Sequence, residues 1–371
     1  MNILIAADYG TPASGNFVAS CVELGRILKI GGSTLTFIIK ENNNTRSETS
    51  WVHWLEREGH RVYLTKYPLQ QEEALVFLKQ VITAHKIDIL HIHFGMFHRL
   101  AVSNSKSLGV KVVVHDHMDF PAGANLRKEI LRCLAYSLVY RINGVAVVSV
   151  NPNKNQAYAL AKHWYVPNGL SMIRNVPESI SREQMRLELG LVPEDKICLF
   201  LGWDLRRKGL DIAVTAIAKL REENPHMLLA VVGVGIPPSQ NCLEFLSGTT
   251  NVDPHSPWIR YWPSREDMFA YHRAADVYLS ASRSEAFSYG ILEAISQNTP
   301  VVASDIKGTS WCHSYDKAVI YPTENPSACA QAIRQSLKLG QSQSNADKIV
   351  CDYSIEKWCN QMLDVYRKML K

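Results

Sequence analysis

The feature that most constrains the fold is an alternation between short apolar runs and longer amphipathic stretches. In the first half of the chain, helical patterns at 16–29 and 71–85 separate runs that are rich in β-branched side chains. These strand candidates are 2–7, 34–39, 61–65, 87–92, 110–115 and 144–149. Near-continuous apolar strands separated by helices are typical of a parallel sheet that is covered on both faces. The pattern therefore predicts an α/β fold.

The alternation breaks near Val166-Pro167-Asn168-Gly169 and then restarts. Proline and Asn-Gly form turns, so we expect a loop there that serves as an interdomain hinge. New strand candidates follow at 196–202, 227–233, 276–280, 299–303 and 318–321, with helices at 209–223, 289–297 and 326–339. A chain of 371 residues accommodates two domains at roughly 100–200 residues each. We predict domains at 1–167 and 168–353, followed by an amphipathic helix within 354–371.

Composition narrows the class of protein. The apolar fraction of 46% and charged fraction of 20% are ordinary for a globular protein with a full core. No apolar run reaches the roughly 18–20 residues that span a bilayer. The opening MNILIAADYG has no basic lead, so we interpret it as a core strand and not as a signal peptide. The eight cysteines are scattered without a CxxC pair, which favours reduced thiols and a cytoplasmic location.

The net charge of +5 is unevenly distributed. Residues 1–167 hold 18 Lys and Arg against 12 Asp and Glu, whereas the remainder holds 22 against 23. A basic first half fits an anionic membrane surface or an acidic acceptor, and it equally fits ordinary solubility charge. Nucleic acid is disfavoured as a partner because no basic stretch is interleaved with aromatic residues.

Four histidines lie at the ends of two predicted strands, as His91 and His93 and as His115 and His117. Alternate residues of a strand share a face, and open α/β folds bind ligands at the carboxyl ends of their strands. We therefore expect at least one of these histidines to act in a ligand site. A metal site is the sharper alternative, with Asp116 or Asp119 as a further ligand, although spacing alone does not separate it from a polar crevice.

The loop between the first predicted strand and helix, residues 8–16, contains Gly10 and Gly15 before Asn16. Glycine lets the backbone approach a ligand, and the helix start offers free N–H groups to an anion. The loop has neither GxGxxG nor the Lys-Ser/Thr of a phosphate-binding P-loop, and a tight turn needs glycine in any case.

The second half contains two candidate anion-binding elements. Arg206, Arg207 and Lys208 follow one strand candidate and precede a helix, where cations can neutralise a diphosphate, although a solvated loop is the simpler alternative. Farther on comes Glu285-Ala286-Phe287-Ser288-Tyr289-Gly290-Ile291-Leu292-Glu293. Ser288 is a good N-cap, so a helix should begin near Tyr289 and direct its first N–H groups at an anion. The two glutamates flank that helix start and can address a sugar hydroxyl and a ribose diol, unless they form an ordinary acidic first turn.

In this order, these elements resemble the retaining glycosyltransferases with two facing Rossmann-like domains, the GT-B fold, and family 4 in particular. The resemblance covers essentially the whole chain. It rests on DILHIH, VVVHDH, VPNG, FLG, RKG, ADVYLSAS and the Glu-x7-Glu element that continues into LEAISQNTPVVASD. It implies parallel sheets, an acceptor-side first domain, a donor-binding second domain and a C-terminal helix that packs back toward the first domain.

The resemblance also implies roles for individual residues. His117 matches the family's cleft histidine near the reacting sugar, Lys208 its diphosphate-binding lysine, Glu285 its sugar-contacting glutamate and Glu293 its ribose-contacting glutamate; we predict His117, Glu285 and Lys208 to be catalytic. The remaining predicted donor residues are Arg206, Arg207, Phe287, Ser288, Tyr289 and Gly290, and those of the acceptor side are Gly15, Asn16, His93, His115 and Asp116.

Three positions depart from the family pattern. Trp203 stands where the family often has arginine, so Arg206 or Arg207 would supply that charge. Ser288 replaces a common glycine, and residues 306–310 replace a Gly-Gly-x-x-Glu-like turn. These departures keep open a catalytically inactive GT-B partner protein. A nicotinamide-dependent oxidoreductase is the other alternative, and the missing GxGxxG argues against it.

The implied reaction is transfer of a hexose-type sugar from a UDP- or GDP-sugar to a hydroxyl, with retained configuration. Cations and the helix start would stabilise the leaving diphosphate. The resemblance to GT-B enzymes implies that this step requires no metal, and no DxD motif lies near the donor site, so we expect neither a metal nor another cofactor. Arg127, Lys128, Arg132 and Arg141 lie on or near an apolar helix at 126–142. Such a helix suits a glycan or lipid-linked acceptor in polysaccharide or glycoconjugate assembly, with weak contact to the inner membrane face.

Overall fold

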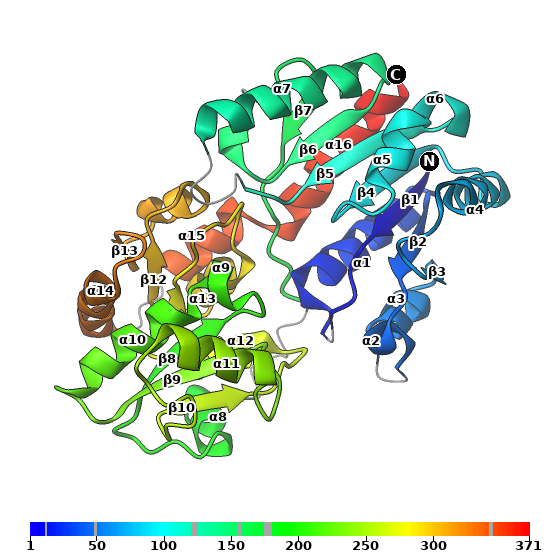
Figure 1. Cartoon of the computed structure of the whole chain (residues 1–371). Coiled ribbons are helices and arrows are strands. Elements are labelled where there is room, and N and C mark those ends of the chain that lie inside the picture. Colours follow the sequence, from blue (N-terminus) through cyan, green and yellow to red (C-terminus); the bar gives the residue numbers. More distant parts are fainter. Residues whose placement is uncertain (12, 48–49, 120–124, 155–156, 174–179, 341–343) are drawn as a thin grey trace. The chain divides into compact units, whose positions relative to one another are not determined.

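A computed structural model describes the chain except for residues 12, 48–49, 120–124, 155–156, 174–179 and 341–343 (Figure 1). Two compact units form, one from residues 1–171 and 353–371 and the other from residues 172–352. The segment Val166–Gly169 lies within the first unit. Just after it, the Leu170 N–H donates to the Tyr353 carbonyl at 2.7 Å, which joins the two stretches of the first unit. The chain therefore leaves the first unit after Ser171, beyond the Pro167 boundary that the turn residues suggest.

A seven-stranded parallel sheet forms the centre of the first unit, in the order β3-β2-β1-β4-β5-β6-β7. Its strands are β1 (Asn2–Ala7), β2 (Thr34–Lys40), β3 (Arg61–Thr65), β4 (Ile89–His93), β5 (Lys111–Asp116), β6 (Ala146–Ser149) and β7 (Lys162–Tyr165). The order of winding reverses between β1 and β4. Open α/β sheets bind ligands at the carboxyl ends of strands beside such a reversal.

The core of this unit follows from strands that are covered on both faces. In β1 every residue from Ile3 to Ala7 is buried. The helices are α1 (Gly15–Ile30), α2 (Asn43–Arg46), α3 (Val52–Arg57), α4 (Gln71–Ala84), α5 (His98–Ser103), α6 (Ser105–Leu108), α7 (Leu126–Ile142), the short 3-10 helix η1 (Pro152–Lys154) and α16 (Ile355–Leu370). Apolar residues three or four apart give α16 one buried stripe, and it packs against α1. The predicted C-terminal helix thus belongs to the first unit.

The second unit repeats the same plan with six parallel strands in the order β10-β9-β8-β11-β12-β13. They are β8 (Lys196–Leu201), β9 (Met227–Val232), β10 (Ile259–Trp262), β11 (Val277–Ser280), β12 (Val301–Ser304) and β13 (Ala318–Tyr321). Here the winding reverses between β8 and β11. The predicted fold class, two α/β units with parallel Rossmann-like sheets, is confirmed.

The helices of the second unit cover this sheet. They are α8 (Arg182–Glu188), α9 (Leu205–Lys208), α10 (Leu210–Arg221), α11 (Gln240–Thr249), α12 (Met268–Ala274), α13 (Tyr289–Ser296), the 3-10 helix η2 (Lys307–Ser314), α14 (Pro326–Leu339) and α15 (Ser344–Asp352). α10 and α14 pack together and share one buried apolar cluster with β8, β9 and β11.

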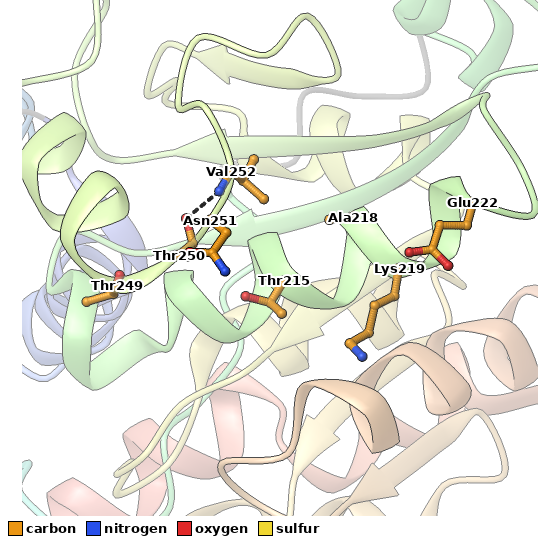
Figure 2. A pocket seen from close by; sticks show the side chains of 8 residues that line it. All are labelled: Thr215, Ala218, Lys219, Glu222, Thr249, Thr250, Asn251 and Val252. Atoms are coloured by element: carbon orange, nitrogen blue, oxygen red, sulfur yellow. Dashed lines mark hydrogen bonds between the residues drawn. The ribbon is translucent and has the colours of Figure 1, made fainter.

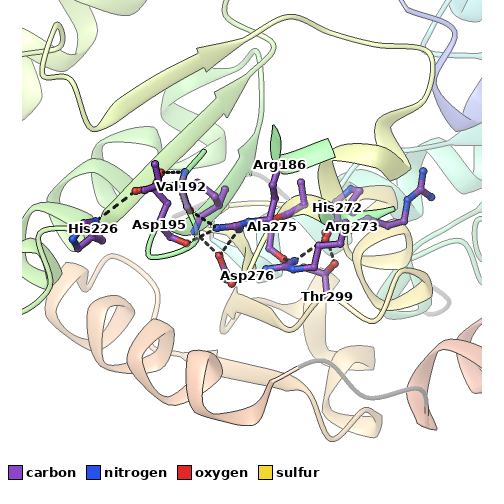
Figure 3. A network of polar contacts seen from close by, with 12 residues as sticks. Arg186, Val192, Asp195, His226, His272, Arg273, Ala275, Asp276 and Thr299 are labelled. Carbon is purple, nitrogen blue, oxygen red and sulfur yellow. Dashed lines mark hydrogen bonds and ion pairs between the residues drawn. The ribbon is translucent and has the colours of Figure 1, made fainter. Parts of the chain in front are cut away.

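A charged network lies at the amino end of β11 (Figure 3). Asp276 accepts hydrogen bonds from the Arg182 guanidinium at 2.7 Å, the Arg186 guanidinium at 3.2 Å and the Ile197 N–H at 2.7 Å. Both arginines belong to α8, so Asp276 fastens this helix to the start of β8. The network lies at the edge opposite to the one where such sheets bind ligands.

The sequence pattern does not predict two of the edge strands, β7 and β10. Their sequences, KHWY and IRYW, contain no apolar run, and residues of both strands stay partly exposed. An edge strand buries less of its surface than a central one, so its composition is less distinctive. Among the helices in the described part of the chain, none is both long and apolar enough to cross a membrane.

Candidate functional site

In the second unit, two predicted residues meet beside the reversal of winding. Lys208 ends the short helix α9 after β8, and Glu285 follows β11, the strand that pairs with β8. The Lys208 ammonium donates to Glu285 Oε1 in an ion pair, and the Arg207 guanidinium lies 3.6 Å from Glu285 Oε2. Ser282 adds a hydrogen bond to Glu285 Oε1 at 3.1 Å. The pairing of β8 with β11 thus brings two motifs that are distant in sequence into one charged cluster.

The charge of Glu285 is set by these neighbours. Burial raises the pKa of its carboxyl, but Lys208 and Arg207 lower it by more, so the net pKa lies below the ordinary value. The side chain is only 10% exposed. A nearly buried carboxylate is therefore held ionised beside two cations.

Local sequence features hold Lys208 in this place. Asp204 caps α9 by accepting from the Arg207 N–H at 3.2 Å, and it also binds the Arg207 side chain at 2.9 Å. Gly209 then turns the chain into α10 with a φ of +75°. A Cβ at this position would lie 2.1 Å from the Ala281 carbonyl oxygen, so only glycine lets α9 approach the end of β11 this closely.

Helix α13 begins at Tyr289 as predicted, but its N-cap differs from the expectation. Ser288 is the N-cap residue, yet its side chain makes no capping hydrogen bond. Its hydroxyl instead bonds to that of the buried Tyr278 in β11, and the same phenol lies under Gly290. The first N–H groups of α13 therefore lack the serine oxygen that would satisfy one of them.

Glu293 lies farther along α13 and is nearly covered. Its Oε2 lies 3.4 Å from the Nε2 atom of the fully buried His272 in α12. The predicted ribose-contacting glutamate is therefore already next to an imidazole within the unit.

The loop after Glu285 is packed by an aromatic pair. Phe287 stacks on Trp311 of η2, with ring centroids 4.7 Å apart and an interplanar angle of 10°. Gly308 of the same element passes so close to the Glu285 backbone that a Cβ would overlap its carbonyl oxygen. The segment 306–310, which departs from the family turn, thus keeps a glycine at a point of close approach.

The structure distinguishes the two arginines that the sequence leaves equivalent. Arg207 lies in the cluster, whereas Arg206 is exposed and forms no ion pair with any described residue. Trp203 is 70% exposed, and the Arg207 guanidinium lies 5.9 Å from its ring centroid. Of the two, Arg207 is the one that lies beside Lys208 and Glu285, and its replacement of the family's arginine stays a prediction.

In the first unit, the four predicted histidines form one hydrogen-bonded cluster with Tyr366 of α16. The Tyr366 hydroxyl lies 2.7 Å from His91 Nδ1, which in turn lies 3.3 Å from His93 Nε2. His93 Nδ1 lies 2.9 Å from His117 Nε2, and His91 Nε2 lies 3.2 Å from His115 Nδ1. The expectation that alternate residues of β4 and β5 share a face is confirmed by these contacts.

Burial keeps this cluster uncharged. His91, His93 and His115 are at most 4% exposed, and only His117 is half-buried. Burial lowers the pKa of His91 to about 3 and that of His117 to about 4, and it lowers those of His93 and His115 well below the ordinary value. His93 and His115, predicted to line the acceptor cleft, are thus too covered to touch a ligand directly in this structure.

A metal-binding interpretation of this cluster has one geometric argument in its favour. Candidate ligand nitrogens of His91, His93 and His115 lie within 4.8 Å of one another. However, His91 already pairs nitrogen to nitrogen with both His93 and His115. In the described part of the chain, neither Asp116 nor Asp119 joins the group.

Asp116 forms hydrogen bonds within the first unit. Its Oδ2 accepts from the Lys154 ammonium at 2.8 Å and from the Tyr158 hydroxyl at 2.7 Å, and its Oδ1 accepts from the Met118 N–H at 2.9 Å. Both carboxylate oxygens thus have partners within the first unit, and the acceptor-side role of Asp116 stays a prediction.

The loop after β1 leads into α1 as predicted, with Pro12 outside the described residues. Gly15 is the first residue of α1 and has a φ of +58°, and Asn16 is buried in the first turn. The Tyr9 hydroxyl closes this loop by donating to the Ser14 carbonyl at 3.0 Å.

Two surface pockets lie away from these clusters. One, in the second unit, lies between the later part of α10 and the end of α11, and its walls carry threonines, Lys219 and Glu222 (Figure 2). The other, in the first unit, lies between the starts of α4 and α5 and is lined by Tyr67, Phe97 and Arg99, among others. Neither is lined by any of the predicted site residues.

The fold is shared with solved glycosyltransferase structures. A glycosyltransferase from Rickettsia africae ESF-5 superimposes with a TM-score of 0.77 and 18% identity, covering 100% of this chain and 98% of that one. Anabaena Alr3699/HepE in complex with UDP-glucose gives 0.76 and 16%, covering 99% and 100%. The two parallel-sheet Rossmann-like units are those of the GT-B glycosyltransferase fold.

The sequence comparisons point in the same direction. Residues 181–349, which make up most of the second unit, match the model of the family described as Glycosyl transferases group 1. A D-inositol 3-phosphate glycosyltransferase from Jonesia denitrificans is 28% identical over 204 residues, which cover 50% of this chain and 46% of that protein. The chain thus spans about half the length of this curated relative. The resemblance found in the motifs is confirmed for the fold and for this domain.

The sequence assigns no individual site role to Ser282, Tyr278, Gly308 or Tyr366, although the first three lie in segments that it singles out. Ser282 lies three residues before Glu285, so its proximity was open to prediction once a turn was expected there. Tyr366 lies on the buried stripe of an amphipathic helix, where the sequence marks it only as a core residue.

Proposed function

We propose that the chain transfers a hexose-type sugar from a nucleotide-sugar to a hydroxyl of a glycan or lipid-linked acceptor, with retained configuration. The observation that carries this proposal is the cluster of Lys208, Arg207 and Glu285 beside the start of α13. Cations beside the N-terminus of a helix, at the reversal of a parallel sheet, are suited to bind a diphosphate. The UDP-glucose bound by a protein of the same fold is consistent with such a donor.

The cluster suggests how the leaving group is stabilised. Breaking the bond between sugar and diphosphate leaves negative charge on the nucleoside diphosphate. Lys208 and Arg207 would interact more strongly with that developing charge than with the intact donor, which lowers the barrier. Glu285, held ionised, would accept a hydrogen bond from a sugar hydroxyl, and Glu293 would accept from the ribose diol.

The roles of the first unit rest on the family resemblance. His117 would hydrogen-bond the sugar or position the acceptor. Its low pKa makes it neutral at physiological pH, so it would act through hydrogen bonding and not through charge. A retained configuration is likewise a feature of the resembled family.

Thermal unfolding with a panel of nucleotides tests the donor site. A ligand that binds only the folded state raises the melting temperature. We expect UDP or GDP to raise it and NAD to leave it unchanged. Lys208→Ala should remove the increase, whereas Arg206→Ala, a neighbouring cation outside the cluster, should retain it. The absence of any shift with millimolar nucleoside diphosphate would contradict the proposal.

A second proposal concerns α7, whose exposed surface mixes apolar and basic side chains. Leu131, Leu138, Val139 and Ile142 are 44% to 65% exposed, although such residues are usually covered. Arg127, Lys128, Arg132 and Arg141 occupy the same helix and are exposed with them. An exposed helix that mixes apolar and basic side chains fits the boundary between acyl chains and anionic headgroups. We propose that α7 holds the protein weakly against an anionic membrane.

Vesicle co-sedimentation tests this second proposal. Binding should require anionic lipid and weaken with salt, because exposed charges are screened over about 10 Å at 0.1 M salt. Leu131→Ser together with Ile142→Ser should reduce binding, whereas Ile30→Ser, an exposed apolar residue of α1, serves as the matched control. Equal binding to neutral and anionic vesicles would contradict it.

A further inference from the structure

The buried Tyr366 hydroxyl determines where the protons of the histidine cluster lie. Tyr366 is fully buried, and among the described residues the only hydrogen-bond partner of its hydroxyl is His91 Nδ1 at 2.7 Å. A phenol has one proton to donate, and leaving it without an acceptor in the interior is costly. The hydroxyl therefore donates to His91 Nδ1, which must carry a lone pair, and the His91 proton resides on Nε2.

The direction of this hydrogen bond sets the direction of the other hydrogen bonds in the cluster. The one lone pair of His91 Nδ1 is already engaged by the Tyr366 hydroxyl, and a lone pair on His93 Nε2, 3.3 Å away, would be repelled by it. His93 therefore carries its proton on Nε2 and shares this acceptor with the phenol. His93 Nδ1 is then an acceptor, and His117 Nε2 at 2.9 Å donates to it. His91 Nε2 donates to His115 Nδ1 at 3.2 Å. One donor thus fixes all four rings as the Nε2–H tautomer.

The opposite arrangement satisfies fewer groups. If all four rings carried the proton on Nδ1, the Tyr366 hydroxyl would have no acceptor and the His115 Nε2 lone pair would have no donor. In the arrangement fixed by Tyr366, the Tyr366 hydroxyl and the His93 Nε2–H share one acceptor, and the His115 Nε2–H is unsatisfied because that atom is buried without a partner among the described residues. Buried polar groups are paired wherever geometry allows, so the Nε2–H set is favoured.

His117 presents a single ring atom for a ligand. Its two faces are covered by Phe94, at 4.5 Å between centroids, and by His115, at 4.3 Å. Its Nε2 is bonded to His93, while Nδ1 has no hydrogen-bond partner within the described chain and is not among the buried atoms. A ligand that reaches this ring therefore meets Nδ1.

We infer that Tyr366 is a positioning residue that, through His91 and His93, makes His117 present a lone pair and not an N–H to its ligand. A lone pair accepts from a hydroxyl and repels a carboxylate or phosphate oxygen. The ring is thereby matched to a neutral hydroxyl donor, such as a sugar. The identity of that ligand rests on the proposed function, whereas the direction of the protons does not.

Nitrogen NMR of the full chain, labelled with ¹⁵N-histidine and free of ligand, tests the inference at neutral pH. Two-bond and three-bond couplings distinguish the two tautomers of each ring. We expect His91, His93, His115 and His117 all to report Nε2–H. Nδ1–H at His117, or stoichiometric metal bound by the cluster in the purified protein, would overturn the inference.

The substitution Tyr366→Phe provides a second test of the inference. Without the hydroxyl, the two proton directions become similar in energy, so the cluster resonances should move toward tautomer-averaged shifts, and turnover should fall with nucleotide affinity unchanged. The matched control is Tyr140→Phe, which removes another buried tyrosine–histidine bond, 2.8 Å long, to His98 of the same unit. It should leave the four tautomers intact. A Tyr366→Phe spectrum with unchanged tautomers would overturn the inference even if the donor site proves correct, and absent nucleotide binding would contradict only the proposed function.

Discussion

The carboxyl edges of the two sheets share one topology and differ in electrostatics. In the first sheet, the strands beside the reversal lead into neutral imidazoles that hydrogen-bond to one another. In the second sheet, the equivalent place holds an ionised carboxylate with two cations. Strand order therefore selects where polar residues gather, and burial together with residue type decides what they can bind. A charged edge suits a diphosphate, whereas a neutral edge suits hydroxyl groups.

The largest expected effect concerns acid. The lowered pKa values of His91, His93 and His115 mean that the unfolded chain binds more protons than the folded one below about pH 6.5. The free energy of unfolding of the first unit should fall by about 1.4 kcal/mol per pH unit for each such histidine as the pH drops from 6.5. Thermal unfolding between pH 7.5 and 5.5 measures this loss.

The charged edge should behave differently over the same range. Because the pKa of Glu285 is lowered, its stabilising contribution is complete above about 4.5 and is lost only as the pH falls further. Glu285→Gln should therefore leave the slope between pH 7.5 and 5.5 unchanged. A melting temperature that is flat over this range would show that the histidine cluster is not held neutral.

A somewhat smaller effect is expected from Lys208→Ala. Removing one preorganised group that stabilises transition-state charge typically lowers kcat about 10²–10³-fold. Initial rates with a nucleotide-sugar, measured beside Arg206→Ala, separate a specific loss from a general change in surface charge. Equal rates for the two variants would remove Lys208 from the reaction.

The smallest of these effects concerns the opposite edge of the second sheet. Asp276→Asn weakens two ion pairs to α8, so it should lower the free energy of unfolding by about 1–3 kcal/mol. Nucleoside diphosphate affinity should stay within about twofold of the unchanged protein when measured well below the melting temperature. A large loss of affinity would mean that charge at the amino edge also takes part in binding.

Much of the fold was open to prediction because its central strands are apolar on both faces. The edge strands β7 and β10 were not, since residues that stay partly exposed carry no apolar run. The N-cap position of Ser288 was correctly predicted, but not its bond, because a buried tyrosine hydroxyl competes for the serine side chain.

The sites were less predictable than the elements that carry them. Lys208 and Glu285 are 77 residues apart, and only the pairing of β8 with β11 brings them together. His91 and Tyr366 are separated by 275 residues. Periodicity describes each helix and strand by itself, so contacts between distant elements come from family resemblance or from the structure.

The central claim is that the second unit binds the nucleotide while His117 of the first unit acts on the reacting sugar or acceptor. Calorimetric binding of UDP and GDP, beside initial rates, tests it with Glu293→Ala and His117→Ala. Losing a charged hydrogen-bond partner costs about 1.5–3 kcal/mol, so Glu293→Ala should weaken nucleotide binding roughly ten- to a hundred-fold. His117→Ala should leave the Kd nearly unchanged while turnover falls. Loss of nucleotide binding in His117→Ala, with binding intact in Glu293→Ala, would contradict the account.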